Sequence, residues 1–221
     1  MSLVIKNLQK SFFQGEDKVQ VLKSVNVDIK NGQIVAIIGQ SGSGKSTLLS
    51  LLAGLDQADS GEVVVDGVNI SSFDEKQITE FRGKNIGIVF QQYHLVSHLT
   101  ALENVMLPME ILNKSDIEKN ARALLQEMGL DHRLDQFPNR MSGGECQRVA
   151  IARALAVRPK ILLADEPSGN LDIHTGDNVM NIFFDVAKKY QITTILVTHS
   201  EALAKRCERV LRLSEGQLLE A

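Results

Sequence analysis

The segment that most constrains this chain runs from Gly39 to Ser46 and reads Gly-Gln-Ser-Gly-Ser-Gly-Lys-Ser. It matches the pattern GxxxxGK(S/T) without a mismatch. A continuous apolar run, Ile34–Ile38, stands directly before it, and helical spacing of apolar residues follows over Ser46–Ala53. An uninterrupted apolar run indicates a strand buried on both faces of a parallel sheet. The segment therefore predicts a layered α/β fold with a mainly parallel sheet.

The residue types in this segment suit a bound phosphate. Glycines let the backbone wrap closely around an anion, so that successive N–H groups and the helix N-terminus point at it. Lys45 adds a positive charge for the outer phosphates, and the Ser46 hydroxyl can ligate Mg²⁺. A chance glycine-rich turn would not account for the Lys-Ser pair and the flanking strand together. We name these residues the phosphate loop and expect all of them to bind cofactor: Gly39, Gln40, Ser41, Gly42, Ser43, Gly44, Lys45, Ser46 and Thr47.

Length and composition favour one folded domain with no membrane span. The 221 residues are 43% hydrophobic and 23% charged, which is enough for one sizeable core and excludes a disordered chain. The longest apolar runs, 34–38 and 161–164, fall far short of the roughly 18 residues that a spanning helix needs. The first six residues show no signal-peptide pattern, so a cytoplasmic protein is expected. The net charge of −3 argues against a nucleic-acid partner.

The order of predicted elements indicates an α/β core with two additions. Short β-branched runs before residue 70 predict an N-terminal antiparallel β subdomain, with a hairpin turn at Asn31-Gly32. Helical spacing over Ala101–Leu112 and Ile117–Met128 predicts an inserted helical subdomain, and Ser115–Glu118 reads as the capping box of its second helix. We expect one domain, 1–221, in which 1–91 and 159–221 form the core and 92–158 the helical subdomain.

Two acids follow another buried-strand run. Ile161–Ala164 leads into Asp165 and Glu166, at the edge where ligands bind in open α/β sheets. Asp165 suits the coordination shell of Mg²⁺, and Glu166 can orient a water for in-line attack. Two acids at a strand end can also form a solvated turn, but the preceding phosphate loop favours the metal and water site.

Recognition of guanine is the first alternative to consider, because Asn113–Asp116 matches the NKxD motif of GTPases. No Asp in the chain is followed three residues later by Gly, so the DxxG switch motif of that class is missing. The four residues also overlap the predicted capping box, and no buried strand leads into them. They are interpreted as a helix start.

The segment Met141–Leu155 resembles the LSGGQ signature of the ATP-binding cassette (ABC) ATPases. The other motifs of that family then follow in order: the phosphate loop, Gln91, the signature, the two acids, Asp172 and His199. Physically, Ser-Gly-Gly opening a helix is a second anion site. The resemblance covers nearly the whole chain and implies an ATPase with a P-loop NTPase core, using ATP and Mg²⁺.

The resemblance also implies a role for each matching residue. Glu166 would be the catalytic base, His199 would contact the γ-phosphate, and Gln91 would reach the metal and the attacking water. The metal ligands would be Ser46, Gln91 and Asp165. In this family the signature of one subunit closes on ATP held by the other, so the resemblance implies a head-to-tail homodimer. The additional cofactor-binding residues would then be Ser142, Gly143, Gly144 and Asp172.

Phe12 resembles the aromatic residue that stacks on adenine in this family, a contact with the π-face that reads no base edge. The alternative is that Phe12 or its neighbour Phe13 belongs to the core. Cys146 is interpreted as a packed apolar residue.

Three segments narrow the resemblance: Phe90–Leu95, Leu99–Val105 and Ala164–Asp172. They are similar to the branch that contains lipoprotein-releasing, macrolide-export and cell-division ATPases. This implies a peripheral subunit on the cytoplasmic face of the inner membrane that powers a separate permease, with a docking segment at Gln91–Leu112. Lipoprotein release or efflux is the expected work, and a regulatory cassette of the cell-division type is the alternative. DNA-acting or ribosome-acting cassettes are less well matched, because they carry a long coiled coil or two cassettes per chain.

Overall fold

The structure is a computed structural model and describes residues 3–15 and 17–221. It divides into two compact units. The first is formed by Met1–Arg82 together with Gln191–Ala221, and the second by Gly83–Tyr190. The helical subdomain predicted at 92–158 lies inside the second unit, and its bounds remain a prediction.

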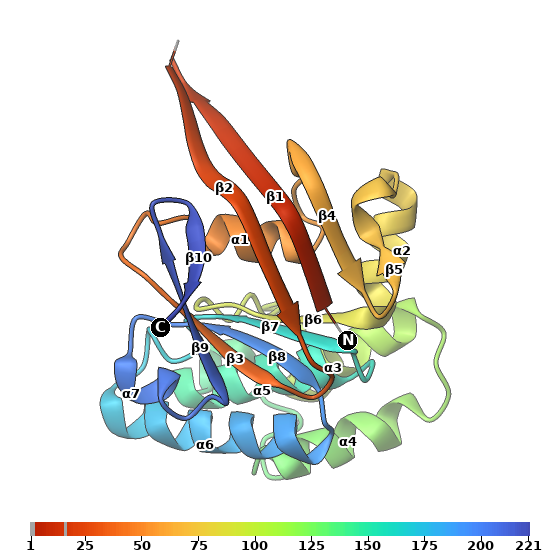
Figure 1. The fold of residues 1–221 in the computed structure, drawn as a ribbon. Helices are drawn as coiled ribbons and strands as arrows, with labels where there is room; N and C mark the ends of the chain where they lie inside the picture. The colour runs from red at the N-terminus through yellow and green to blue at the C-terminus, as the bar shows by residue number, and fades with distance from the viewer. Residues whose placement is uncertain (1–2, 16) are drawn as a thin grey trace. The chain divides into compact units, whose positions relative to one another are not determined.

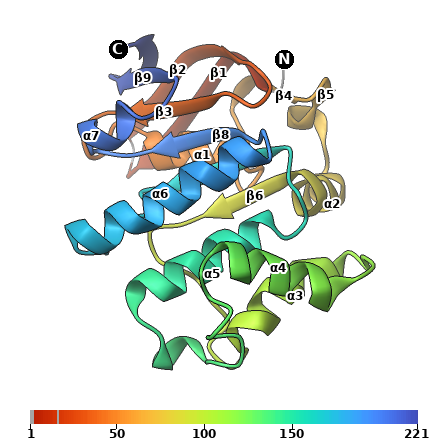
Figure 2. The same cartoon turned by 90° about the horizontal axis from the view of Figure 1, so that it is seen from below.

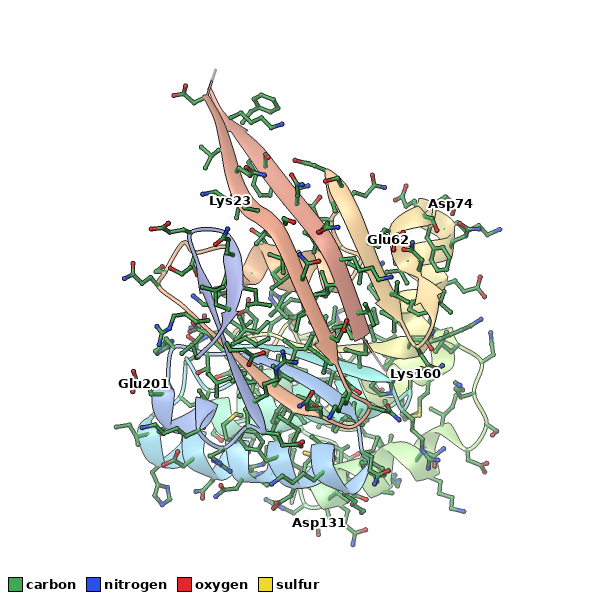
Figure 3. All side chains as sticks on the ribbon, viewed as in Figure 1. Lys23, Glu62, Asp74, Asp131, Lys160 and Glu201 are labelled. Carbon is green, nitrogen blue, oxygen red and sulfur yellow. The ribbon has the colours of Figure 1, made fainter. Side chains whose placement is uncertain are left out.

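An antiparallel sheet opens the first unit, and its strands lie in the order β2-β1-β4-β5. Figure 1 shows β1 and β2 as one long hairpin. Alternate residues of β2 are buried toward its end, which is the period-two pattern of a sheet with one apolar face. Lys23 and Glu62, labelled in Figure 3, lie on exposed positions of β2 and β4. The bounds are β1 Leu3–Gln14, β2 Asp17–Ile29, β4 Ser60–Val65 and β5 Val68–Asn69.

A second group of strands in this unit carries the predicted buried run. The strand β3 (Ile34–Ile38) is buried at every position and pairs in parallel with both β8 (Thr193–Val197) and β9 (Arg209–Ser214). The strand β10 (Gln217–Glu220) pairs antiparallel with β9. The helical elements of this unit are α1 Lys45–Leu52, η1 Ile70–Ser72, α7 Glu201–Ala204 and the start of α2 Glu75–Asn85.

The hairpin predicted at Asn31-Gly32 is wrong. Those two residues do form the turn between β2 and β3, but the two strands belong to different sheets. The turn therefore passes the chain from one sheet to the other. The runs Val19–Leu22 and Val25–Ile29 are parts of the single strand β2, which continues through Ser24 with a positive φ of 56°.

Helices dominate the second unit. Figure 2 shows α3, α4 and α5 packed together, in agreement with the contacts among them. Two strands, β6 and β7, pair in parallel with Ile86 opposite Ile161. Together the two units confirm the expected α/β fold with an antiparallel N-terminal sheet. The bounds are β6 Ile86–Val89, α3 Ala101–Ile111, α4 Ile117–Glu127, η2 Pro138–Arg140, α5 Gly143–Leu155, β7 Ile161–Asp165 and α6 Ile173–Lys189.

The capping box predicted at Ser115–Glu118 is also wrong. The N-cap of α4 is Asp116, in a left-handed conformation and without a side-chain hydrogen bond to the helix. The Glu118 carboxylate is instead paired with Arg122, one turn further along. An i,i+4 ion pair on the helix surface has replaced the cap. Among the described residues, no helix combines the length and apolarity needed to cross a membrane.

Candidate functional site

The phosphate loop of the first unit begins with a glycine that no larger residue can replace. A Cβ on Gly39 would lie 2.4 Å from the backbone oxygen of Leu213. At Gly44 the backbone has a φ of 98°, and a Cβ would lie 2.7 Å from Cγ1 of Val21. The loop is therefore wedged closely against β9 and β2. Gly39 and Gly44 are required by packing as well as by any anion, whereas a Cβ on Gly42 would meet nothing within 4 Å.

Lys45 lies at the first position of α1 with its side chain folded back over the loop. Its ammonium donates to the backbone oxygens of Gly39 at 2.9 Å and Gln40 at 2.8 Å. The N-cap of α1, Gly44, provides no side-chain hydrogen bond, so the first N–H groups of the helix are left uncapped by a side chain. The loop therefore presents a positive charge and a helix N-terminus in one place, which is the physical requirement of an anion site.

The hydroxyls of the loop differ in their surroundings. Ser41 and Ser46 are exposed, and Thr47 is half-buried. The Oγ of Ser43 is buried and has no hydrogen-bond partner within the described part of the chain. A buried hydroxyl without a partner costs free energy. Ser43 is thus an orphaned polar atom inside a loop whose chemistry suits phosphate.

Phe12 lies on β1 and is not a core residue. Its side chain is 43% exposed, and that of Phe13 is 76% exposed. The ammonium of Lys10 lies 5.0 Å from the centroid of the Phe12 ring, within the range of a cation–π contact. Lys10 is itself held by Asp56 at 2.8 Å. The core alternative is therefore excluded for both aromatic residues.

His199 follows β8 at its carboxyl end, with its side chain exposed. The backbone around it is held by Thr198, whose Oγ1 accepts from the N–H of Ser200 at 3.0 Å. Ser200 then caps α7 by accepting from the N–H of Leu203. The histidine therefore lies on a short, defined connection between a buried strand and a helix.

In the second unit the signature forms the start of α5. Ser142 is the N-cap: its Oγ accepts from the N–H of Glu145 at 3.3 Å, and the Glu145 carboxylate accepts from the N–H of Ser142 at 2.8 Å. These reciprocal bonds make a capping box. Glu145 also pairs with Arg133 at 2.8 Å. Burial acts to raise the pKa of Glu145, but the hydrogen bonds from Ser142 and Arg133 outweigh it and leave that pKa lowered.

The two signature glycines lie against neighbouring segments of the same unit. A Cβ on Gly143 would approach the Tyr93 hydroxyl to 2.6 Å, and a Cβ on Gly144 would approach Cγ2 of Thr175 to 2.4 Å. Cys146 is buried, as expected of a packed residue, and its Sγ contacts the backbone oxygen of Pro138. Burial raises the pKa of this thiol.

Gln91 and the segment before α6 are joined by an amide pair. The Nε2 of Gln91 donates to Oδ1 of Asn170 at 3.1 Å, and Nδ2 of Asn170 donates to the backbone oxygen of Gln91 at 3.0 Å. Gly169 lies so close that a Cβ there would meet Nε2 of Gln91 at 2.8 Å. Asp172 caps α6 by accepting from the N–H of Thr175 at 3.0 Å. Hydrogen bonds from the Thr175 side chain and then from this N–H lower the pKa of Asp172. The structure therefore brings Gln91 and the Asp172 segment together.

The two acids leave β7 at its carboxyl end. Asp165 is the last residue of the strand, and Glu166 follows with a positive φ of 45°. Both side chains are half-buried. The N–H of Gly169 donates to the backbone oxygen of Glu166 at 2.9 Å and closes the turn. A left-handed conformation is uncommon for a residue other than glycine and concentrates at functional sites.

Several residues with a part in this arrangement were not predicted from the sequence. The spacing of Ser142 and Glu145 is a capping-box signal that is visible in the sequence, but the box predicted above lies at Ser115–Glu118. Asn104 is buried, and its side-chain amide bonds the backbone of Val96, Leu99 and Thr100, which organises the loop before α3. No local pattern reveals such contacts. The same holds for three further residues that bond the backbone around Gln91, namely Gln147, Arg153 and Asn170.

Known proteins share both the sequence and the fold. The sequence profile of the family described as ABC transporter matches residues 22–169. The chain is 47% identical to the uncharacterized ABC transporter ATP-binding protein YbbA of Escherichia coli K12, covering 98% of this chain and 96% of that protein. It is 43% identical to the lipoprotein-releasing system ATP-binding protein LolD of Myxococcus xanthus, covering 99% of each.

A solved structure agrees with these relatives. The post-hydrolysis dimer of the ATP-binding cassette MJ0796, bound to ADP and Pi, is similar with a TM-score of 0.89 and 39% identity, covering 98% of this chain and 96% of that one. The residues matched by the family profile, 22–169, include the phosphate loop, the signature and both acids. The chain therefore belongs to the ABC transporter family, as an ATP-binding subunit that hydrolyses ATP.

Proposed function

We propose that two copies of this chain bind two ATP molecules head to tail and power a separate membrane subunit that releases lipoproteins from the inner membrane. The phosphate loop carries the proposal, because it places the positive charge of Lys45 beside the uncapped start of α1, and both suit an anion. The signature offers a second helix start, in which the hydroxyl of Ser142 is exposed. Each ATP would lie between the phosphate loop of one copy and the signature of the other. The solved relative bound to ADP and Pi is itself a dimer.

Mg²⁺ would be held by Ser46, Gln91 and Asp165 together with phosphate oxygens. Among the described residues, no group of three or more His, Cys, Asp or Glu side chains could hold a metal ion alone. This fits Mg²⁺, which is bound through one or two carboxylates plus substrate phosphates in such sites. When bound, the ion neutralises charge that develops on the phosphates. The oxygen donors present are therefore of the right kind.

Hydrolysis would depend on Glu166, His199 and Gln91. The Glu166 carboxylate would take up hydrogen bonds from the attacking water and orient it toward the γ-phosphate. His199, exposed after β8, would contact that phosphate. Gln91 is held by Asn170 in the present arrangement, and its amide would turn to the metal and the water when nucleotide is bound. Phe12 would stack on the adenine with its exposed face.

The docking segment Gln91–Leu112 would receive the membrane subunit. Tyr93, Leu95, Val96 and Leu99 place aromatic and apolar side chains in its loop, each only half-buried. Apolar groups left partly exposed on a defined loop are typical of an interaction site. The chain would then lie on the cytoplasmic face of the inner membrane without entering it.

Several relatives are named for lipoprotein release, and they favour this function for the present chain. One is LolD of Geobacter metallireducens, with 45% identity over 98% of this chain. A regulatory cassette acting on a cell-division scaffold is the alternative. Affinity purification from detergent-solubilised membranes separates the two. Recovery of a permease that releases lipoproteins from proteoliposomes on addition of ATP supports release, whereas recovery of a division-septum protein supports the alternative.

The nucleotide mechanism is tested by Glu166→Gln, which keeps the size of the side chain but removes its charge. Positioning and general-base help contribute typically about 10²–10⁴-fold, so turnover should fall by that order. ATP binding should survive, and size-exclusion chromatography with Mg²⁺ and ATP should show a stalled dimer. Adding Ser142→Arg should return it to monomer, because a bulky side chain would fill the second phosphate site. A Glu166→Gln protein that hydrolyses ATP at the wild-type rate would refute the role of this residue.

A further inference from the structure

Side chains of the signature helix hold the backbone around Gln91. We name Phe90–His94 the glutamine segment. Nε2 of Gln147 donates to the backbone oxygen of Phe90 at 3.2 Å. The guanidinium of Arg153 donates to the backbone oxygens of Tyr93 at 3.0 Å and His94 at 2.6 Å. Both donors lie on α5, so the helix that begins with the signature also binds both ends of the glutamine segment.

The spacing of the two donors matches this task. They are six residues apart on one helix, which corresponds to about 9 Å along its axis at roughly 1.5 Å per residue. Gln147 lies about one turn after Gly143, the first residue of the helix. A single helix therefore carries Ser142, Gly143 and Gly144 at its start and the two contacts to the glutamine segment further along. The rings of Phe90 and His94, 5.0 Å apart and edge to face, close the segment on itself.

Both donors are shielded from water to some degree, Gln147 completely and Arg153 in part. Gln147 is completely buried, and its Oε1 has no hydrogen-bond partner within the described part of the chain. Arg153 is half-buried, and this burial lowers the pKa of its guanidinium. Apolar side chains would fill such positions without these penalties. Hydrogen bonds orient the backbone in a way that apolar contacts do not, because the planar guanidinium of an arginine can bind two neighbouring carbonyls in one fixed geometry.

We propose that Arg153 and Gln147 are positioning residues that fix the glutamine segment to the signature helix, so that Gln91 and the signature move as one body. This inference rests on the proposed function of Gln91 and the signature. Its consequence is mechanical: a displacement of the docking segment by the membrane subunit is passed through the carbonyls of Tyr93 and His94 to α5. The side-chain amide of Gln91 remains free to exchange Asn170 for the nucleotide site.

The test is a double-mutant cycle on ATP hydrolysis by the full chain at saturating Mg²⁺ and ATP. Arg153→Met keeps an unbranched apolar stem in place of the arginine methylenes and removes the guanidinium donors, and Gln91→Ala removes the group through which Arg153 acts. Arg122→Met is the matched control, because Arg122 is a surface arginine of the same unit that pairs with Glu118. Thermal melting and ATP-binding stoichiometry are recorded for every variant, so that kcat is expressed per folded site.

In the wild-type background, Arg153→Met should lower kcat by at least about tenfold, because the hydrogen bonds from the charged guanidinium to the backbone of the glutamine segment are lost. The ATP dissociation constant should stay within about twofold, since the phosphate loop is untouched. Arg153→Lys should give an intermediate kcat, because the charge remains but the fork is lost. In the Gln91→Ala background, Arg153→Met should cost less than about a further twofold, which a general structural defect would not reproduce.

Two results would overturn the inference: an unchanged kcat for Arg153→Met, or an equal loss in both backgrounds. Should Arg153→Met fail to fold, Arg153→Lys and Gln147→Met complete the same cycle and are judged by the same criterion. A wild-type chain that binds ATP without hydrolysing it would instead contradict the proposed function. The two failures are therefore distinguishable.

Discussion

Replacing Phe12 by alanine should weaken ATP binding while leaving the fold intact. Stacking of a base on an aromatic side chain is worth about 1–3 kcal/mol by alanine substitution. At about 1.4 kcal/mol per factor of ten, this corresponds to a roughly 5- to 150-fold rise in the dissociation constant. Phe12→Tyr should restore affinity to near the wild-type value, because the π-face is preserved. Isothermal titration with ATP measures both variants.

The exposure of the ring sets the expected cost in stability. Complete burial of a Phe side chain is worth about 1.5–3 kcal/mol, and Phe12 is 43% exposed, so its removal should cost about 0.9–1.7 kcal/mol. For a chain of this length that lowers Tm by at most about 7 °C. Lys10 keeps its hydrogen bonds to Asp56 and to the backbone oxygen of Gln57 when the ring is removed. No buried charge is therefore left without a partner.

Phe13→Ala is the matched control. Phe13 is the next residue of the same strand and is 76% exposed, so its loss should change both stability and affinity little. An affinity of Phe12→Ala equal to that of the wild type would refute the stacking role. Equal losses of affinity for the two alanine variants would show that the hairpin, rather than the Phe12 ring, supports the nucleotide.

Two further predictions concern the second unit. Leu95→Asp should abolish co-purification of the membrane subunit and leave ATP binding unchanged. Leu55→Asp, at an exposed leucine of the other unit, should change neither property. A membrane subunit that still co-purifies with Leu95→Asp would contradict the proposed docking segment. The lowered pKa of Glu145 means that its ionised form stabilises the fold above its ordinary pKa and that this stability is lost as pH falls through the lowered value. Urea unfolding between pH 7 and pH 3 should therefore show a smaller acid loss for Glu145→Gln than for the wild type, and identical profiles would contradict it.

The parts of the fold that follow from sequence are those with a local cause. The buried runs predicted at Ile34–Ile38 and Ile161–Ala164 are strands to within one residue, because burial on both faces leaves no polar position. Strand partners have no such local cause. The turn at Asn31-Gly32 has hairpin chemistry, yet the chain after it joins another sheet.

The capping boxes show how one pattern can succeed or fail. The spacing of a hydroxyl residue and a Glu three positions later occurs before α3, α4 and α5. It forms the box at Thr100–Glu103 and Ser142–Glu145. Before α4 the acid finds Arg122 instead. The competing partner lies one helical turn away, so the pattern alone cannot decide between the two.

The candidate site divides along the same line. Motifs identify the residues that would touch phosphate, because the chemistry demands those types in that order. The motifs do not identify the residues that hold these side chains in position. Asn170, Gln147 and Arg153 act on backbone oxygens, and every residue has one, so no pairing of side chains appears in the sequence. The arrangement becomes visible only when the fold places α5 beside the glutamine segment.

The signature glycines meet two requirements at once. Their backbone N–H groups suit a phosphate, but Gly143 and Gly144 would also collide with Tyr93 and Thr175 if either carried a Cβ. A substitution at either glycine would therefore report packing and ligand binding together. Ser142 is exposed at the start of the helix, so added bulk there meets solvent on the free chain. Ser142→Arg therefore avoids both collisions, and its cost to the fold is the lost N-cap of α5, about 0.5–2 kcal/mol, which thermal melting of the variant measures separately from binding.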